Sequence, residues 1–294
     1  MKSSKDWAKL TANPRFADDT YRLFLQLYGA VVGGKGIHPF TQIIKDYRQQ
    51  HGLEEHADLD VGELKEIVGL FKKIHLPPDN PWTQLENAIG AVFSSWNNPR
   101  AQTYRRLNDI PDSIGTAVII QAMVFGNMGQ NSGSGIAFTR NPSTGENVFF
   151  GEWLPNAQGE DVVAGIRTPH PIIDNKKSKT SLSVSMPKAF EELSDVRKRL
   201  ENHFDDMQDI EFTIQENKLW MLQTRRGKRT GIAAIKIATD MVKEQLITKK
   251  VAVGRVHPLQ IYESLLKNIE PEDLENCSPS SVGLPAGPGA SCGA

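Results

Sequence analysis

Apolar and polar residues alternate strictly along residues 209–214, which read Asp-Ile-Glu-Phe-Thr-Ile. This period of two predicts a strand with one buried face. A second run, residues 219–225, is rich in apolar residues and follows after a short polar stretch. We predict a hairpin with a three-residue loop at 216–218, because that register pairs Ile214 with Trp220 and gathers the apolar side chains on one buried face.

The same register brings four polar side chains together on the opposite face. Glu211 is predicted to pair with Gln223, and Asp209 with Arg225, whereas a two-residue loop would oppose Glu211 to Leu222 and mix the faces. Mg²⁺ favours one or two carboxylates together with phosphate oxygens, and an arginine fork fits phosphate. The face therefore suits a magnesium–polyphosphate site. The same residues also fit a solvated strand face with one cross-strand ion pair.

Three amphipathic helices are predicted within the first 108 residues, from apolar residues spaced three and four apart. The third begins after Asn80, a good N-cap, with Pro81 at the first helical position. The apolar stripes, which we assign to a core, are Tyr21, Phe24, Leu25 and Tyr28; Leu64, Ile67, Val68, Phe71 and Ile74; and Leu85, Ile89, Val92, Phe93 and Trp96.

Strands and glycine dominate from about residue 115. The mostly apolar run 116–124 predicts a buried central strand. Residues 126–135 form a glycine-rich loop, which either binds phosphate through backbone N–H groups or simply connects strands. Two more strands are expected at 136–140 and 148–154, and a helix at 232–246.

The composition of the chain argues against several classes of function. The chain has 294 residues, enough for roughly two domains, and its 34 Lys+Arg against 35 Asp+Glu give no electrostatic case for nucleic acid or an anionic membrane. No apolar run approaches the length of a membrane span. Cys277 and Cys292 make neither a disulfide framework nor a zinc site. We expect a soluble protein of the cytoplasm, or of an organelle if a leader has been lost.

Four motifs in order carry a family resemblance: residues 133–146, 156–165, 207–213 and 222–225. Together they resemble the nucleotide-binding domain of pyruvate, phosphate dikinase. The C-terminal residues 284–290 resemble the opening of that family's phosphohistidine domain. The resemblance covers nearly the whole chain.

The resemblance implies an α+β fold with an incomplete ATP-grasp nucleotide-binding domain. It implies a helical insert subdomain at 1–108, a β-rich ATP-grasp subdomain at 109–230, a helical linker at 231–282 and a truncated phosphohistidine domain at 283–294. The family's N-terminal lobe, with its phosphate-gripping lysine and arginine, has no matching segment here. The full-length protein is expected to be a homodimer.

The resemblance also implies roles for particular residues. Glu211, Gln223 and Asp209 would lie at the Mg²⁺–ATP polyphosphate site, and Arg225, the catalytic candidate, would steady phosphate charge. Glu160 would face the ribose, although a plain loop carboxylate is the alternative. The adenine would be edged by Gln121, Met123 and Val124. For Arg140 and Asn141 a structural turn role is at least as good an interpretation as phosphate contact.

In that family the β-phosphoryl group of ATP passes to a histidine, phosphate accepts the γ-phosphoryl group, and phosphoenolpyruvate forms from pyruvate in a separate domain. None of the seven histidines here has the expected Thr-Ser-His context. The chain alone is therefore expected to be an inactive fragment, with pyruvate and phosphoenolpyruvate as partners of the full-length enzyme only. The alternatives are a pyruvate, water dikinase fragment and a non-catalytic nucleotide-binding remnant.

Overall fold

The computed structural model describes residues 4–53, 59–163, 168–173 and 179–265. The chain divides into two compact units, Met1–Met123 and Val124–Ala294. The end of the predicted linker and the predicted start of a phosphohistidine domain lie outside the described residues. Within the described ranges, no helix combines the length and the apolar character needed to cross a bilayer.

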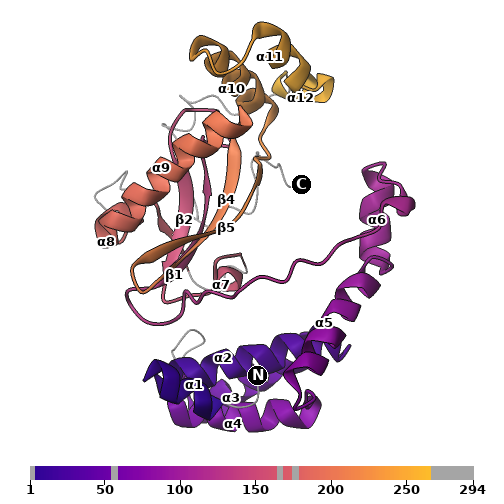
Figure 1. Cartoon of the computed structure of the whole chain (residues 1–294), viewed down its shortest axis with the longest axis vertical. Helices are drawn as coiled ribbons and strands as arrows, with labels where there is room; N and C mark the ends of the chain where they lie inside the picture. The colour runs from indigo at the N-terminus through magenta and orange to yellow at the C-terminus, as the bar shows by residue number, and fades with distance from the viewer. Residues whose placement is uncertain (1–3, 54–58, 164–167, 174–178, 266–294) are drawn as a thin grey trace. The chain divides into compact units, whose positions relative to one another are not determined.

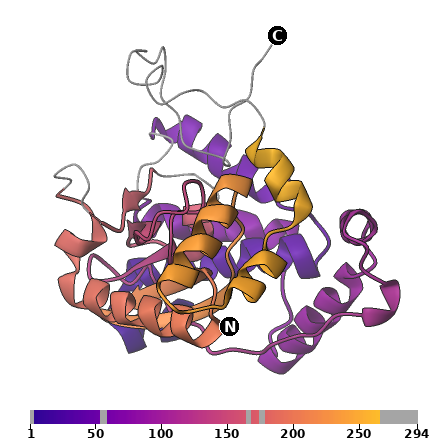
Figure 2. The same ribbon diagram turned by 90° about the horizontal axis from the view of Figure 1, so that it is seen from above.

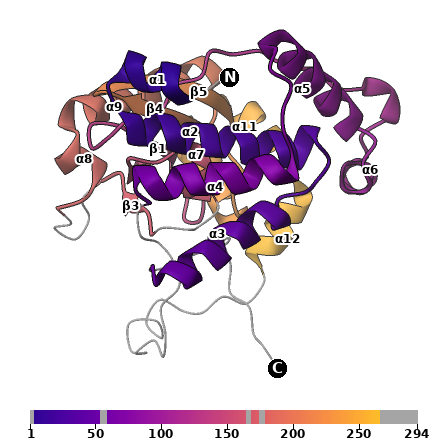
Figure 3. The same cartoon turned by 90° about the horizontal axis from the view of Figure 1, so that it is seen from below.

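The first unit is helical. Its helices are α1 (Ser4–Thr11), α2 (Pro14–Leu27), α3 (His38–His51), α4 (Val61–Ile74), α5 (Pro81–Ser95) and α6 (Pro99–Leu107), with a π-helix at Tyr28–Val32 and a 3-10 turn at Asp112–Ile114. Helix α2 lies beside α4 (Figure 3). The predicted stripes of these two helices meet in one core, where Leu25, Ile67 and Phe71 are fully buried.

Helix α5 begins as predicted, with the Asn80 side chain accepting a hydrogen bond from the backbone N–H of Trp82 and Pro81 in the first turn. The expectation that its whole apolar stripe is core is wrong. Phe93 is 49% exposed, and Val92 is exposed as well. A helical stripe is buried only where another element packs on it, and the second half of α5 lacks such cover from the described residues.

The run 116–124 is not a strand, contrary to the sequence prediction. Ile119 is 85% exposed, and Ile120 and Met123 are exposed too. A strand forms only when its backbone N–H and C=O groups find a neighbouring strand, and no described strand pairs with this run. Apolar, β-branched composition alone does not supply that partner.

The second unit is built on a five-stranded antiparallel sheet with the order β3-β2-β1-β4-β5 (Figure 1). The strands are β1 (Gly133–Phe138), β2 (Phe150–Pro155), β3 (His170–Pro171), β4 (Gln208–Gln215) and β5 (Lys218–Arg226). The predicted strands at 136–140 and 148–154 and the predicted hairpin are thereby confirmed, with small shifts at their ends. The chain is an α+β protein, as expected.

One sheet face packs against α8 (Leu182–Ser185) and α9 (Pro187–Phe204), which crosses the sheet in Figure 1. Ile210, Phe212 and Ile214 of β4 are fully buried there, as their alternation predicts. Gly135 of β1 is needed for this packing. A Cβ at that position would lie 2.4 Å from the Phe212 ring and 2.6 Å from a backbone oxygen of β2.

Helices α10 (Gly231–Lys243), α11 (Lys249–Arg255) and α12 (Pro258–Ser264) follow the sheet and group together, as Figure 2 shows in orange and yellow. The predicted helix at 232–246 is confirmed by α10. Its buried face, which includes Ile237 and Met241, packs against Met207 and the partly buried Phe138. This contact joins α10 to the ends of β1 and β4.

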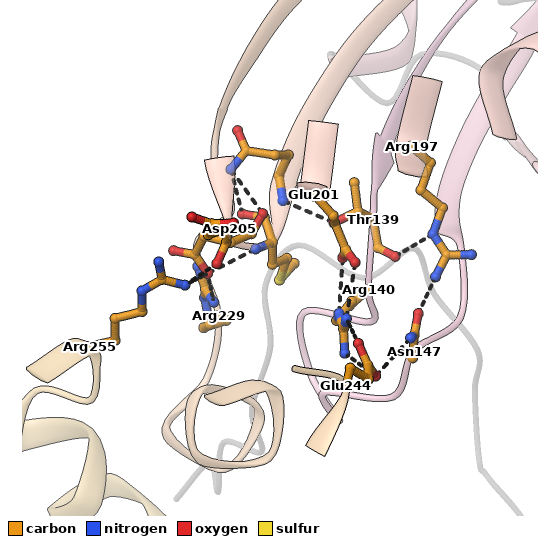
Figure 4. A network of polar contacts seen from close by, with 12 residues as sticks. Thr139, Arg140, Asn147, Arg197, Glu201, Asp205, Arg229, Glu244 and Arg255 are labelled. Atoms are coloured by element: carbon orange, nitrogen blue, oxygen red, sulfur yellow. Dashed lines mark hydrogen bonds and ion pairs between the residues drawn. The ribbon is translucent and has the colours of Figure 1, made fainter. Parts of the chain in front are cut away.

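Arg140, just after β1, is completely buried and binds two carboxylates (Figure 4). Its Nε and Nη2 donate to both oxygens of Glu201 on α9, each at 3.0 Å, and its Nη1 donates to Glu244 after α10 at 3.1 Å. Burial alone would lower the pKa of Arg140, but these hydrogen bonds outweigh it and raise the pKa. Asn141 accepts hydrogen bonds from the N–H groups of Ser143 and Thr144. These contacts favour the structural role over phosphate contact for both Arg140 and Asn141.

We predict that Arg140→Met lowers the free energy of unfolding of the second unit by about 3–5 kcal/mol, because two carboxylates lose their buried partner. Native-state hydrogen exchange of the β1 and β4 amides measures this. Lys198→Met removes the same charge from an exposed pair with Asp195 at 3.8 Å and should change stability by less than about 0.5 kcal/mol. Equal effects of the two substitutions would contradict the assignment.

Candidate functional site

The β4–β5 hairpin turns through two residues, Glu216 and Asn217, and the predicted three-residue loop is wrong. Both have positive φ, 51° and 66°, as the type I′ turn of a tight hairpin requires. Ile214 pairs with Leu219 instead of Trp220. Turn type follows from backbone dihedral angles that residue periodicity does not report.

A β-bulge then shifts the register between Glu211 and Phe212, leaving Leu222 of β5 unpaired. Beyond the bulge Glu211 pairs with Gln223, and Asp209 with Arg225. Both predicted polar pairs are therefore confirmed, although the bulge that produces them was not predicted.

Trp220 does not lie in the core, contrary to expectation. It pairs with Thr213 and so lies on the same face as Glu211, where it is 39% exposed. The Nζ of Lys218 lies 4.2 Å from the centre of its ring, a cation–π contact. The polar face thus carries an aromatic side chain near the hairpin tip.

The registers define a row of residues that crosses the polar face perpendicular to the strands. It runs from Gln223 through Glu211 and Ile136 to Glu152 on β2. Strands are spaced about 4.8 Å apart, so the two carboxylate-bearing positions lie about 10 Å apart at their Cα atoms. The side chains of Glu211, Gln223 and Glu152 make no hydrogen bond or ion pair within the described part of the chain.

Asp209 and Arg225 occupy the next row and bind each other, with Asp209 Oδ2 accepting from Arg225 Nε at 2.6 Å. Asp209 is buried and Arg225 is exposed. The hydrogen bond and the charge of Asp209 raise the pKa of Arg225, and Glu211 adds to the effect. Arg225 is therefore a permanently cationic group. It is exposed to solvent next to Glu211 and Gln223, whose side chains have no partner within the described residues.

Other elements cover this face on both sides of the row. At one end Ser134 and Thr213 are buried and share a hydrogen bond of 3.0 Å, and helix α7 (Gly159–Val163) packs there through Val162. At the other end Phe138 packs against α10. The row with Glu211 and Gln223 lies between the two covered ends.

The glycine-rich loop is closed against the motif that follows β2. The N–H of Gly129 donates to the Asn156 side chain at 3.0 Å, and the N–H of Gly126 donates to Gln158 at 3.5 Å. A Cβ on Gly126 would lie 2.1 Å from the carbonyl oxygen of Ala157. These contacts favour the connecting role over phosphate binding for this loop.

The remaining predicted site residues are not brought together with the row. Gln121 and Met123 belong to the first unit and are exposed, and Val124 begins the second unit. Glu160 lies in α7, which packs on the polar face, but its side chain is outside what the structure describes. Their roles stay predictions.

The protein supplies only part of a metal ion's coordination sphere at this row. Within the described residues, the chain has no cluster of three or more His, Cys, Asp or Glu side chains that could hold a metal ion. Glu211 and Gln223 supply one carboxylate and one amide oxygen. This set fits Mg²⁺ when phosphate oxygens and water complete the coordination.

Glu152 is the residue that sequence reasoning missed. It reaches the row only through the pairing of β2 with β1, which brings it to the face that holds Glu211. Burial raises the pKa of Glu152. The sequence did place Glu152 in a predicted strand, between Phe150 and Leu154. It does not give the order of the strands in the sheet, and that order decides whether Glu152 lies in the same row as Glu211.

Comparison with known proteins identifies the family. The model for "Pyruvate phosphate dikinase, AMP/ATP-binding domain" matches residues 49–189 and 186–246. The pyruvate, phosphate dikinase of Rhizobium meliloti is 50% identical over 290 residues, which are 95% of this chain and 32% of that protein. The Clostridium symbiosum enzyme is 48% identical over 294 residues, 98% of this chain and 33% of that protein. The chloroplastic enzyme of Flaveria pringlei is 46% identical over 285 residues, 95% of this chain and 29% of that protein.

The matched residues contain all five strands and the polar face, so the class is that of an AMP- or ATP-binding domain. The chain belongs to the pyruvate phosphate dikinase AMP/ATP-binding domain family. It spans about a third of the length of the curated relatives it matches. These relatives carry the name of the phosphate-using enzyme, and so do not favour the pyruvate, water dikinase alternative.

We predict that Glu152→Gln stabilises the second unit at pH 7. Burial raises the folded-state pKa above the ordinary value of 4.5, so ionisation costs stability above that pH and costs nothing below it, where the carboxyl is protonated in both states. The advantage of the variant should therefore shrink as pH falls from 7 to 4. Hydrogen exchange of the sheet amides across this range measures it. The exposed Glu192→Gln on α9 is the control, and an equal pH dependence in both variants would refute the prediction.

Proposed function

We propose that the polar face of the β4–β5 hairpin binds Mg·ATP. Glu211 and Gln223 would hold the metal ion together with phosphate oxygens, and Arg225 would neutralise phosphate charge. Asp209 would orient Arg225 through its Oδ2 and offer its other oxygen, Oδ1, to the metal shell. The single observation that carries the proposal is the row that sets the Glu211 carboxylate beside the Gln223 amide, next to the exposed Arg225. Neither the carboxylate nor the amide has a partner among the described residues.

The charge of this face supports a metal-dependent mode of binding. Asp209, Glu211 and Glu152 bring three carboxylates against the one guanidinium of Arg225. Polyphosphate is repelled by such a surface unless a divalent cation lies between them. Mg²⁺ would supply that positive charge, and its chemistry is to shield the phosphate oxygens during phosphoryl transfer.

We further propose an ATP-grasp mode of binding, in which a second lobe covers the nucleotide. Gln121, Met123 and Val124 would edge the adenine and Glu160 would face the ribose. The exposed, unpaired run 116–124 supports this, because its backbone groups are open to partners outside the described residues. Trp220 adds an exposed ring on the same face that a base or sugar could contact.

For the whole protein we propose the dikinase activity that its relatives are named for. The domain would present ATP so that its phosphoryl groups pass to a histidine and to phosphate, and phosphoenolpyruvate, AMP and diphosphate would form from pyruvate, ATP and phosphate. The residues of this chain would position the phosphates and balance their charge, which is most of what phosphoryl transfer asks of a protein.

Titration calorimetry of this chain with ATP, with and without Mg²⁺, tests the proposal. We expect binding only with Mg²⁺, and a loss of about tenfold or more in affinity for Glu211→Gln, since a charge-assisted contact contributes roughly 1.5–3 kcal/mol. The matched control is Glu216→Gln at the exposed hairpin tip, which should bind like the unchanged chain. Binding that needs no metal, or that is equal in both variants, would show that ATP binds elsewhere.

In the full-length protein the same pair of variants separates binding from turnover. Glu211→Gln should lower the rate of AMP formation from ATP in the presence of phosphate and pyruvate, whereas Glu216→Gln should leave it unchanged. A full-length Glu211→Gln protein with unaltered turnover would contradict the assigned role.

A further inference from the structure

A second cluster of charged residues lines a cavity of about 630 Å³ where the sheet meets α10, α11 and α12. Its cationic side chains are Arg226, Lys228, Arg229 and Arg255. Asp206 is the one carboxylate among the described residues that line it. Figure 4 shows Arg229 and Arg255 converging from different elements on this point.

Asp206 is already saturated by its neighbours. Its Oδ1 accepts from Arg229 Nη1 at 2.8 Å, and its Oδ2 lies 2.8 Å from Arg226 Nε, with Arg255 Nη1 at 3.7 Å from Oδ1. Burial would raise the pKa of Asp206, but the arginines outweigh it and the pKa is lowered. One carboxylate against four cations leaves the cavity with a net charge of three positive units.

Arg229 also has a buried donor that no described residue accepts from. Its Nε donates to the carbonyl of Gly227 at 3.0 Å and its Nη1 to Asp206, but its Nη2 is buried and has no hydrogen-bond partner among the described residues. The Arg229 side chain is only 8% exposed. A buried donor without an acceptor is costly, more so on a charged group. Arg229 belongs to the lining of the cavity, and a small shift of its guanidinium would let an anion bound there accept from this donor.

This cavity is separate from the proposed ATP face. Arg226 pairs with Gln208 on β4, so it lies on the opposite side of the sheet from Arg225, which pairs with the next residue, Asp209. The ATP proposal uses none of the residues that line the cavity. The proposed ATP site therefore does not account for the net charge of this cavity or for the unpartnered Nη2 of Arg229 among the described residues.

We propose that the cavity is a binding site for a small phosphate-bearing anion. Arg229 would be its fixed, buried contact, since a guanidinium fork fits a tetrahedral oxyanion. Arg226 and Lys228 would be the solvent-side contacts. Arg255 at the end of α11 would complete the site, so that the anion ties the α10–α12 group to the turn after β5.

Titration calorimetry with inorganic phosphate and with diphosphate tests this, in the absence of nucleotide and Mg²⁺ and at constant ionic strength set with chloride. We compare the double variant Arg226→Gln/Lys228→Gln with Lys236→Gln/Lys243→Gln. The control removes the same charge from exposed lysines that pair with Asp240 on α10. Thermal melting establishes that each variant is folded. We expect the cavity variant to lose about tenfold or more in affinity and the control about twofold at most.

The two anions and the two double variants together distinguish the size of the bound anion and test whether it binds in the cavity or elsewhere. Tighter binding of diphosphate than of phosphate, or the reverse, identifies the ligand size and supports the site either way. No binding to the unchanged chain at millimolar anion, or equal losses in both double variants, would overturn the proposal. Loss of binding in Arg225→Gln with retention in the cavity variant would overturn it too, because the anion would then occupy the ATP face.

Discussion

A β-bulge at Leu222 lies between the tip of the β4–β5 hairpin and its polar end. The two-residue turn alone would continue a register in which Glu211 opposes Leu222. The one extra residue on β5 moves Gln223 to that position and keeps Arg225 beside Asp209. Bulges of this kind redirect side chains without breaking the sheet. The composition of the candidate site therefore depends on one unpaired residue.

The buried Arg140 cluster fixes the end of β1, the strand that pairs with β4 of this hairpin. Arg140 connects the end of β1 to Glu201 on α9 and Glu244 after α10, and Arg197 of α9 donates to the carbonyl of Thr139 at 2.7 Å (Figure 4). Each charge is matched by several hydrogen bonds, which offsets the cost of burial. One face of the sheet is covered by α9. On the other face, the polar side chains of the central row have no partner in the described part of the chain and are available for a ligand.

Much of this arrangement was predictable from local pattern, and the misses have two causes. The loop length and the side of the sheet that Trp220 occupies depend on backbone dihedral angles at Glu216 and Asn217 and on the bulge. Strand alternation and helix caps act within a few residues, so the two strands of the hairpin and the start of α5 followed from the sequence. The pairs of Glu211 and Asp209 were predicted through a three-residue loop, but a two-residue turn and a bulge produce them. The exposure of Phe93, the extended run 116–124 and the contribution of Glu152 depend on which elements meet in space. Residue spacing carries no information about a missing partner or about the order of strands in a sheet.

The central claim is that the metal–nucleotide complex sits on the row of Glu211, Gln223 and Glu152. Substituting Mn²⁺ for Mg²⁺ in the presence of ATP and measuring paramagnetic broadening of assigned amide signals tests it directly. We expect the strongest broadening at Glu211 and Gln223, weaker broadening at Glu152, and the least along α9 on the opposite face of the sheet. Strongest broadening on α9, or around Arg229 and Arg255, would contradict it.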